Sequence, residues 1–245
     1  MLEVQGLAKN YDGLEAVSGL SFQVAEGEIL GLVGPNGAGK TTTLRCLAGI
    51  LPPTAGTVLI CGHDLASNPV EAKRRMAFIA DEPRLFDYLT VAEHLEFIAR
   101  IYQVADAAPR AEALLTELEL SDKRTSLPGE LSRGMKQKLA IACGLLHDPR
   151  VILLDEPLTG LDPVGIRRTK DSIARRARDG AAVIVSSHLL HLVEEMCHRI
   201  LMIKSGRKVA HGTLAEIKAA APDLQADASL EEVFLHVTAQ EPPAT

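Results

Sequence analysis

The amino-acid sequence predicts an α/β protein built on a mostly parallel β-sheet. Three short, apolar runs have the length and composition of strands that are buried on both faces, and they are Ile29–Val33, Val151–Leu154 and Ala181–Val185. Helical patterns of apolar residues lie between these runs, as crossovers between parallel strands require. A glycine-rich loop follows the first run, and acidic or polar residues follow the other two.

The glycine-rich loop Gly34–Thr41 fits G-x-x-x-x-G-K-[ST], the pattern of a phosphate-binding P-loop. Glycines let backbone N–H groups turn inward around an anion, and a helix start adds donors and the positive end of its dipole. Lys40 would reach the β- and γ-phosphates, and the Thr41 hydroxyl would bind Mg²⁺. The alternative is a glycine-rich turn that fits the pattern by chance. Nucleotide binding is favoured because a helix is predicted directly after the loop, as the motif requires. The helix shows one apolar face, formed by Leu44, Leu47, Ala48 and Leu51, and ends at Pro52-Pro53.

The composition indicates a folded, acidic protein with an aliphatic core. Hydrophobic residues make up 47% of the chain, but aromatic residues only 3%. The net charge of −6 argues against a general nucleic-acid binder. The 4 cysteines show no C-x-x-C spacing, which favours free thiols over disulfides or zinc. No signal-peptide pattern begins at Met1 and no apolar run could span a bilayer, so we expect any membrane part to be a separate chain.

The segment before the glycine-rich loop is predicted to form an antiparallel β subdomain. Leu2–Tyr11 and Leu20–Val24 have the composition of strands, and an Asp12-Gly13 turn separates them. Tyr11 is either an ordinary strand aromatic or a platform on which a nucleotide base stacks, because every base offers a π face. A further short strand is expected at Thr57–Cys61.

Carboxylates follow two of the predicted core strands. Met76–Ala80 ends at Asp81-Glu82, and the second apolar run ends at Asp155-Glu156. Ligands of open α/β sheets bind beyond the carboxyl ends of the strands. Asp155 suits Mg²⁺, usually through water, and Glu156 is placed to act as a base for an attacking water. The alternatives are an acidic turn before a proline for the first pair and carboxylates that only cap a strand for the second.

His188 follows the third apolar run and therefore belongs to the same sheet edge. A single histidine is usually a polar group whose hydrogen bonds are satisfied within the fold. At the carboxyl end of a core strand it could instead contact a γ-phosphate.

The middle of the chain, about residues 88–148, predicts an inserted helical subdomain. Thr90-Val91-Ala92-Glu93 is a capping box at the start of one helix, and a second helix is expected from Ala107 to Leu118. The segment Arg84–Leu89 before them holds two of the few aromatic residues, which either fold inward or face a partner.

A third helix of this subdomain begins after Ser132, a sound N-cap, and reaches about Leu146. Its first turns carry Arg133, Lys136 and Lys138, where the helix dipole favours acids. This start is either a site for an external anion or a capped surface helix with solvated lysines.

The last part of the chain predicts a basic helix, a hairpin and a C-terminal helix. The helix after Asp162-Pro163 carries six arginines and lysines, which we interpret as a solvated face. Ile200–Ile203 and Lys208–Ala210 predict a hairpin, and Ser229-Leu230-Glu231-Glu232 is a capping box. We therefore expect a nucleotide-binding domain at residues 1–220 and a C-terminal helix with a loose tail at residues 221–245.

Taken in order, five segments resemble the motifs of the ATP-binding cassette (ABC) ATPases, and the resemblance covers nearly the whole chain. Leu131–Gly134, just ahead of an acidic strand end, is its most specific part, and the ending Ser229–Phe234 is similar to stand-alone cassettes that pair with ABC-2-type exporter permeases. The Walker A, signature, Walker B, D-loop and H-loop motifs correspond to Gly34–Thr41, Leu131–Met135, Val151–Glu156, Gly160–Asp162 and His188.

The resemblance implies a P-loop NTPase fold, with ATP and Mg²⁺ as cofactors and Glu156, His188 and Lys40 as catalytic residues. It implies head-to-tail dimers in which the signature helix start of one subunit closes on ATP held by the other. It also implies that an ABC-2-type permease, a separate chain, holds the protein on the cytoplasmic face of the membrane. Tyr11 matches the aromatic residue that stacks on adenine. The implied nucleotide-binding residues are Tyr11, Gly34, Pro35, Asn36, Gly37, Ala38, Gly39, Lys40, Thr41, Thr42, Ser132 and Gly134.

Three residues in two motifs depart from the family pattern. The signature is usually Leu-Ser-Gly-Gly-Gln, and here Arg133 and Met135 replace a glycine and the glutamine. The glutamine of the family's Q-loop falls at Asp81. Since a carboxylate binds Mg²⁺ directly or through water, Asp81 joins Thr41 and Asp155 as a candidate metal ligand.

A cassette ATPase without a transport role is the alternative function, as a regulatory or mechanochemical module in DNA repair, chromosome structure or translation. The chain has no sustained heptads between its P-loop and signature segments, and it holds one cassette. A GTPase or kinase is disfavoured because no N-K-x-D occurs and Leu131–Gly134 would be unexplained. We expect no nucleic-acid partner.

Overall fold

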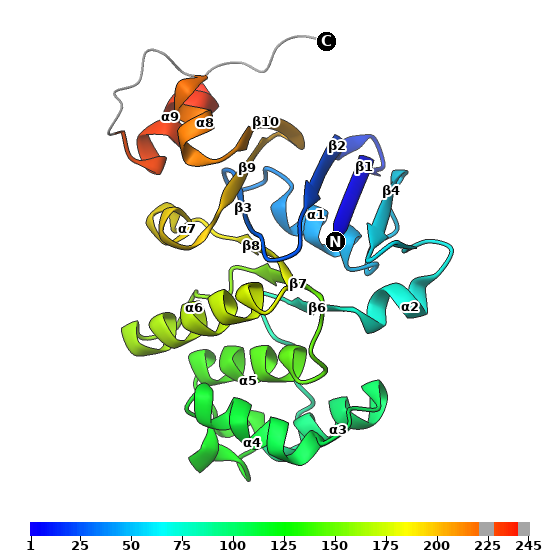
Figure 1. The fold of residues 1–245 in the computed structure, drawn as a ribbon, viewed down its shortest axis with the longest axis vertical. Coiled ribbons are helices and arrows are strands. Elements are labelled where there is room, and N and C mark those ends of the chain that lie inside the picture. Colours follow the sequence, from blue (N-terminus) through cyan, green and yellow to red (C-terminus); the bar gives the residue numbers. More distant parts are fainter. Residues whose placement is uncertain (221–227, 240–245) are drawn as a thin grey trace.

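The computed structural model describes residues 1–220 and 228–239, and within them two β-sheets are surrounded by helices (Figure 1). The first sheet is antiparallel and has the strand order β2-β1-β4-β5. The second has the order β10-β9-β3-β8-β7-β6, and all its neighbouring strands are parallel except β9 and β10. The predicted α/β fold with an antiparallel N-terminal subdomain is thus confirmed. The strands are β1 Leu2–Tyr11, β2 Leu14–Val24, β3 Ile29–Val33, β4 Ala55–Ile60, β5 His63–Asp64, β6 Met76–Ile79, β7 Val151–Asp155, β8 Ala182–Ser186, β9 Arg199–Lys204 and β10 Arg207–Gly212.

The helices divide among the faces and ends of the sheets. In Figure 1, α3, α4 and α5 form a group at one end of the molecule, and α8 and α9 lie at the opposite end. The described residues contain no helix with the length and apolar character needed to cross a membrane. The helices are α1 Lys40–Leu47, α2 Pro69–Arg74, α3 Val91–Tyr102, α4 Ala107–Glu117, α5 Arg133–Leu145, α6 Pro163–Arg178, α7 Leu190–Met196, α8 Leu214–Ala219 and α9 Leu230–Ala239, with 3₁₀ turns at Ser121–Lys123 and Pro128–Glu130.

The central sheet separates two hydrophobic cores because successive side chains of a strand point to opposite faces. In β7, Leu153 belongs to the core that contains α1 and the first sheet. Its neighbours Ile152 and Leu154 belong to the core that contains α3, α4 and α5. Every residue of β3, β7 and β8 is buried. Apolar side chains are therefore required on both faces, which explains the continuous apolar runs in the sequence.

The helix starts follow the predicted capping. The Thr90 hydroxyl accepts a hydrogen bond from the Glu93 N–H, and the Glu93 carboxylate accepts one from the Thr90 N–H. Ser132 and Asp162 cap α5 and α6 in the same way. The helical group α3–α5 lies within the predicted subdomain, whose limits remain a prediction. The loose tail that we expect within residues 221–245, from Glu241 onward, lies outside the described residues.

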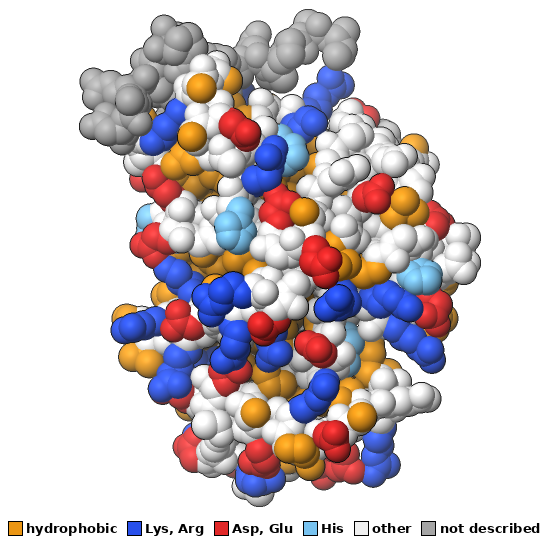
Figure 2. Space-filling view, in the orientation of Figure 1, with side chains coloured by type: hydrophobic (Ala, Val, Ile, Leu, Met, Phe, Trp, Pro, Cys, Tyr) orange, Lys and Arg blue, Asp and Glu red, His pale blue; other side chains and the backbone are white. Residues whose placement is uncertain are grey.

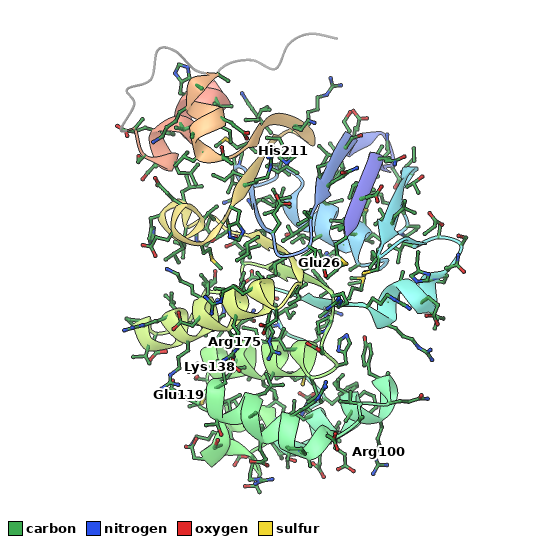
Figure 3. The ribbon with its side chains drawn as sticks, in the orientation of Figure 1. Glu26, Arg100, Glu119, Lys138, Arg175 and His211 are labelled. Carbon is green, nitrogen blue, oxygen red and sulfur yellow. The ribbon has the colours of Figure 1, made fainter. Side chains whose placement is uncertain are left out.

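The basic residues of α6 form ion pairs with the helical group as well as facing solvent. The Glu119 carboxylate, just after α4, pairs with Lys138 of α5 and Arg168 of α6, both at 3.2 Å. Arg175 of α6 pairs with Glu117. Figure 3 shows Glu119, Lys138 and Arg175 along the junction of these helices, and Figure 2 shows acidic side chains among the basic ones on this face. Arg168 and Arg175 remain about half exposed, so they are solvated as expected, and their ion pairs also join the helical group to α6.

Other elements are absent from the sequence prediction for physical reasons. Strand β2 begins at Leu14, whereas the sequence predicts a start at Leu20. Gly19, with φ 62°, and the register shifts in the pairing of β2 with β1 disturb the alternation of apolar and polar side chains, so the first half of the strand does not show a strand pattern. Helices α2, α7 and α8 span 6 or 7 residues. So short a helix shows little apolar periodicity and depends on tertiary packing.

The close packing of α7 on β3 predicts a specific stability effect. A Cβ atom at Gly31 would lie 2.5 Å from Cγ1 of the fully buried Val193. Gly31→Ala should therefore lower the free energy of unfolding by about 1–3 kcal/mol, and Val193→Ala in the same chain should recover part of that loss. Urea unfolding followed by circular dichroism measures both effects. Gly129→Ala is the control, because no atom lies near its added methyl group. Equal stabilities of the Gly31→Ala and Gly129→Ala variants would contradict this packing.

Candidate functional site

The parallel strands bring the predicted site residues to one edge of the sheet. In the register of β7 and β8, Asp155 pairs with Ser186, and in that of β3 and β8, Leu32 pairs with the same serine. The carboxyl ends of all three strands therefore lie side by side. The glycine-rich loop leaves β3 there, Glu156 leaves β7, and the segment to His188 leaves β8.

The loop from Gly34 to Gly39 is fixed from two sides. A Cβ atom at Gly34 would lie 2.4 Å from the Ile203 carbonyl oxygen, and one at Gly39 would lie 2.4 Å from that of Ala16. Gly39 also has φ 102°, which favours glycine. The Ala38 N–H donates to the Pro35 carbonyl at 3.1 Å, which closes the turn. Strands β2 and β9 thus lie so close to the loop that positions 34 and 39 leave no room for a side chain.

Lys40 begins α1 and turns back along this loop. Its ammonium donates to the carbonyls of Gly34, at 2.7 Å, and Pro35, at 3.3 Å. Only 9% of the residue is exposed. Burial lowers the pKa of the Lys40 ammonium from its ordinary value, and the carboxylates of Glu156 and Asp155 oppose the shift. The cation is therefore close enough to both acids to interact with them across the strand ends.

Asp155 is the buried carboxylate of the site, with 3% exposure. The Ser186 hydroxyl donates to its Oδ1 at 2.7 Å and accepts the Glu156 N–H at 3.1 Å. Ser186 is fully buried and joins the two acids in one network. Ser186 was not predicted from the sequence as a site residue. The register of β7 against β8 was the missing signal, since it places this serine opposite Asp155.

Glu156 and His188 contact each other directly. The Glu156 Oε2 atom lies 2.8 Å from the His188 Nδ1 atom and accepts the His188 N–H at 3.2 Å. Glu156 has φ 49°, in the left-handed region, where a residue other than glycine costs about 1–2 kcal/mol. A strained residue at a strand end is characteristic of functional sites. The arrangement holds a carboxylate and an imidazole together at the edge where the loop begins.

The α5 start lies against other segments. Ser132 caps the helix by accepting the Met135 N–H at 3.2 Å, and a Cβ atom at Gly134 would lie 2.8 Å from the Gly160 carbonyl oxygen. Asp81 pairs with Arg133 at 3.3 Å. Two of the departures from the family pattern are therefore paired with each other. A metal at Asp81 would compete with the Arg133 guanidinium, so this candidate ligand remains a prediction.

A second contact joins α5 to the end of β6. The buried Gln137 donates from Nε2 to the Ala80 carbonyl at 3.3 Å, directly before Asp81. Sequence reasoning did not single out Gln137, whose neighbours on the helix gave no sign of this long-range bond.

The remaining candidate residues surround the loop. Thr41 and Thr42 lie in the first turn of α1 and are half-buried, while Pro35, Asn36 and Gly37 are exposed at the loop tip. Tyr11 ends β1 and is 41% exposed, and the Lys9 ammonium lies 5.2 Å from its ring centroid. An exposed ring face is compatible with either role that the sequence left open for Tyr11.

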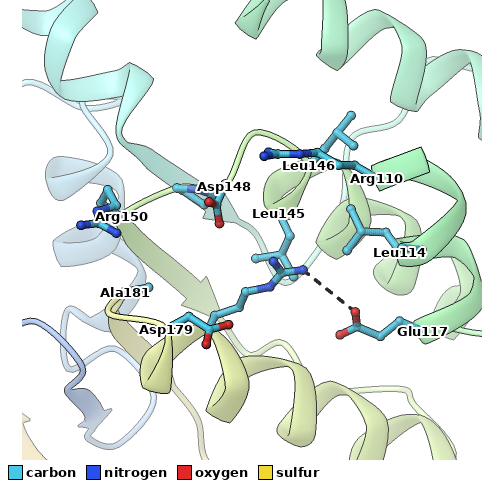
Figure 4. A pocket seen from close by; sticks show the side chains of 12 residues that line it. Arg110, Leu114, Glu117, Leu145, Leu146, Asp148, Arg150, Asp179 and Ala181 are labelled. Carbon is cyan, nitrogen blue, oxygen red and sulfur yellow. Dashed lines mark ion pairs between the residues drawn. The ribbon is translucent and has the colours of Figure 1, made fainter. Parts of the chain in front are cut away.

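A cavity of about 340 Å³ lies elsewhere, between α4, α5 and α6 (Figure 4). It borders Arg150 and Ala181, which precede β7 and β8, so it lies at the amino ends of these strands. Three arginines and three acids line it: Arg110, Arg150, Arg176, Glu117, Asp148 and Asp179. These charges balance, and the cavity is not part of the site at the opposite edge.

A strand, a glycine loop and a helix, with an acidic strand end beside them, define a P-loop nucleotide-binding protein. The family model for ABC transporters matches residues 17–159. A relative, the Nod factor export ATP-binding protein I of Burkholderia pseudomallei, is 39% identical over 213 residues, which cover 86% of this chain and 70% of that protein. The chain therefore belongs to the ABC transporter family, as an ATP-binding subunit.

Two solved structures agree with this assignment. An ATP-binding subunit of an ABC transporter superposes with a TM-score of 0.92 at 34% identity, over 97% of this chain and 99% of that one. A dimeric ATP-binding cassette in a post-hydrolysis state, bound to ADP and Pi, superposes with a TM-score of 0.81 at 26% identity, over 87% and 99% of the two chains. ATP hydrolysis is thus an activity of the family to which the chain belongs.

The network around Ser186 predicts that alanine substitutions of the neighbouring residues Ser186 and Ser187 lower the free energy of unfolding by unequal amounts. Ser186→Ala removes a hydrogen bond to a buried carboxylate and one from a backbone N–H, so the free energy of unfolding should fall by about 1–3 kcal/mol. Ser187→Ala is the matched control, because its hydroxyl accepts the Leu189 N–H, at 3.1 Å, which is not part of the network around Asp155 and Glu156. Thermal and urea unfolding measure both. A larger loss for Ser187→Ala would contradict the network.

Proposed function

We propose that the chain is the ATP-hydrolysing subunit of an ABC exporter and that it drives a separate membrane permease. The observation that carries this proposal is the meeting of the glycine loop, Lys40, Asp155, Glu156 and His188 at one sheet edge. Phosphoryl transfer depends mainly on positioning and on electrostatic stabilisation, which such a set supplies.

Each side chain has a distinct role in this proposal. The N–H groups of the loop and α1 bind the phosphates, and Lys40 leaves its carbonyl partners to contact them. Thr41 and Asp155 are oxygen donors at the loop and strand end, which suits Mg²⁺, and Mg²⁺ when bound neutralises phosphate charge. Glu156 accepts the proton of the attacking water, and His188 orients Glu156 and faces the γ-phosphate. Tyr11 stacks on the base.

A second copy of the chain completes the site in this proposal. Ser132 is exposed at the start of α5, and this start carries Arg133 and no acidic residue in its first turn. The basic helix start of one subunit then contacts the γ-phosphate held by the loop of the other. The solved dimer with ADP and Pi supports a dimer as the working state, and the head-to-tail arrangement is the one that the family resemblance implies.

The segment Asp81–Leu89 is proposed to contact the permease. Tyr88 is 91% exposed and Phe86 is 53% exposed, as the outward alternative predicts. The segment is nevertheless held in place, because the Phe86 N–H donates to Nε2 of the buried His94 at 2.9 Å and the Phe86 ring packs edge-on against Phe97. Since His94 Nε2 accepts, Nδ1 carries the proton and donates to the Thr90 carbonyl. A fixed loop with exposed aromatic rings is suited to docking.

The kind of partner is inferred from the relatives. The export function in the name of the Nod factor relative supports an export role. We propose an ABC-2-type permease as the partner, which would hold this subunit on the cytoplasmic face of the cell membrane. Copurification with such a permease would favour this role over the regulatory alternative.

Lys40 and Glu156 should have separable effects. Lys40→Ala removes the cation from the phosphates, so ATP affinity and turnover should both fall at least about tenfold. Glu156→Gln keeps the shape but loses the base, so turnover should fall by a factor of about 10²–10⁴ while ATP remains bound and intact in a trapped dimer. Equilibrium binding, phosphate release and sedimentation measure these changes. Equal ATP hydrolysis by the wild type and Glu156→Gln would refute the role of the base.

If the segment Asp81–Leu89 couples ATP hydrolysis to the permease, removal of its aromatic side chains should reduce transport without reducing basal ATPase activity. Phe86→Ala with Tyr88→Ala should leave the basal ATPase of the isolated subunit within about twofold of normal and weaken permease binding at least about tenfold, as loss of two aromatic anchors would. Ile50→Ala with Val70→Ala is the matched control, since both residues are exposed and apolar but lie outside this segment, after α1 and in α2. Permease capture and transport in vesicles measure the effect. If the aromatic double variant transports at the wild-type rate, this segment does not couple.

A further inference from the structure

The short helix α7 begins directly after the His188 segment. It begins at Leu190, two residues after His188, and spans 7 residues without a side-chain N-cap. The His188 side chain is half-exposed, so few packing contacts fix it directly. Its backbone N–H nevertheless donates to the same Glu156 oxygen that its ring contacts. The backbone at the start of α7 must therefore be held in place for both contacts to form.

Helix α7 depends on three neighbours, since a helix of this length is not stable alone. Val193 is fully buried above Gly31 of β3, where no side chain larger than hydrogen fits. Glu195 forms an ion pair with Lys170 of α6. Glu194 accepts the Leu230 N–H of α9 at 3.1 Å.

The contact with α9 joins the C-terminal helix to the site. The Glu194 carboxylate lies at the start of α9, where the helix dipole favours a negative charge. The Ser229–Glu232 capping box is formed, with the Ser229 N–H donating to Glu232 at 2.7 Å. Leu230 and Val233 are fully buried in a third core that also contains Val193 and Val33, the last residue of β3 before the loop.

We propose that α9 is a positioning element for ATP hydrolysis: through Glu194 it holds α7, and α7 holds His188 against Glu156. This role of the C-terminal helix is separate from phosphate binding by the glycine loop and from the carboxylates at the strand ends. The inference rests on the proposed function, because only a catalytic Glu156–His188 pair makes the position of α7 matter for turnover. Loss of the Glu194 contact, which does not involve the phosphate loop, would therefore loosen the pair.

The test compares Glu194→Ala, Glu194→Gln and the control Glu231→Ala, whose carboxylate is exposed on the first turn of α9. The readouts are the NMR resonances of the His188 imidazole, assigned with His188→Ala, and steady-state ATP hydrolysis. In Glu194→Ala the His188 resonances should move, and kcat should fall about three- to tenfold while KM for ATP stays within about twofold, because binding is not altered. Glu194→Gln keeps a hydrogen-bond acceptor, so its His188 resonances and its kcat should lie close to those of the wild type. Glu231→Ala should match the wild type in both readouts.

A second variant guards against misfolding of the first. Ser229→Ala weakens the α9 cap without altering α7, so it should move the His188 resonances in the same direction by a smaller amount. Unchanged His188 resonances in both Glu194→Ala and Ser229→Ala would overturn the proposal, whatever the ATPase rates. Shifted resonances with unchanged kcat would leave the positioning intact and refute instead the catalytic role of His188.

Discussion

The parallel pairing of β3, β8 and β7 is the constraint on which the rest of the structure depends. Its register sets Leu32 and Asp155 beside the same residue, Ser186. A shift by one residue would turn every side chain to the other face and separate the loop from the acids. The two cores on either side of the sheet make such a shift unfavourable, because each strand residue is buried. The fold therefore fixes the distances within the site before any ligand is present.

The polar groups at this edge form a small network inside an otherwise aliphatic protein. Ser186 bridges Asp155 and Glu156, and Glu156 contacts His188. In a partly buried site such bonds are stronger than in water, and an unpaired member is costly. Glu156 is held in a left-handed conformation that the network and the strand end impose. Rigid placement of this kind is what electrostatic catalysis of phosphoryl transfer requires.

The sequence was sufficient for features that depend on local pattern. Continuous apolar runs predicted the core strands, and Thr90, Ser132 and Asp162 marked true helix starts because capping is local chemistry. The glycine loop, Asp155, Glu156 and His188 followed from their places at strand ends. Features that depend on long-range register could not be predicted, and Ser186 is the clearest case. The pairs Asp81–Arg133 and Glu117–Arg175 join segments far apart in the chain, so these ion pairs could not be predicted from the sequence.

The central claim is that one sheet edge binds the nucleotide phosphates and the metal together. It is tested most directly by a crystal structure of the Glu156→Gln chain grown with ATP and Mg²⁺. We predict phosphates against the backbone N–H groups of Gly34–Thr41, the Lys40 ammonium moved from the Gly34 carbonyl to phosphate oxygens, and Mg²⁺ between Thr41 and Asp155. A nucleotide bound away from this loop, or a metal held without Thr41 and Asp155, would contradict the account.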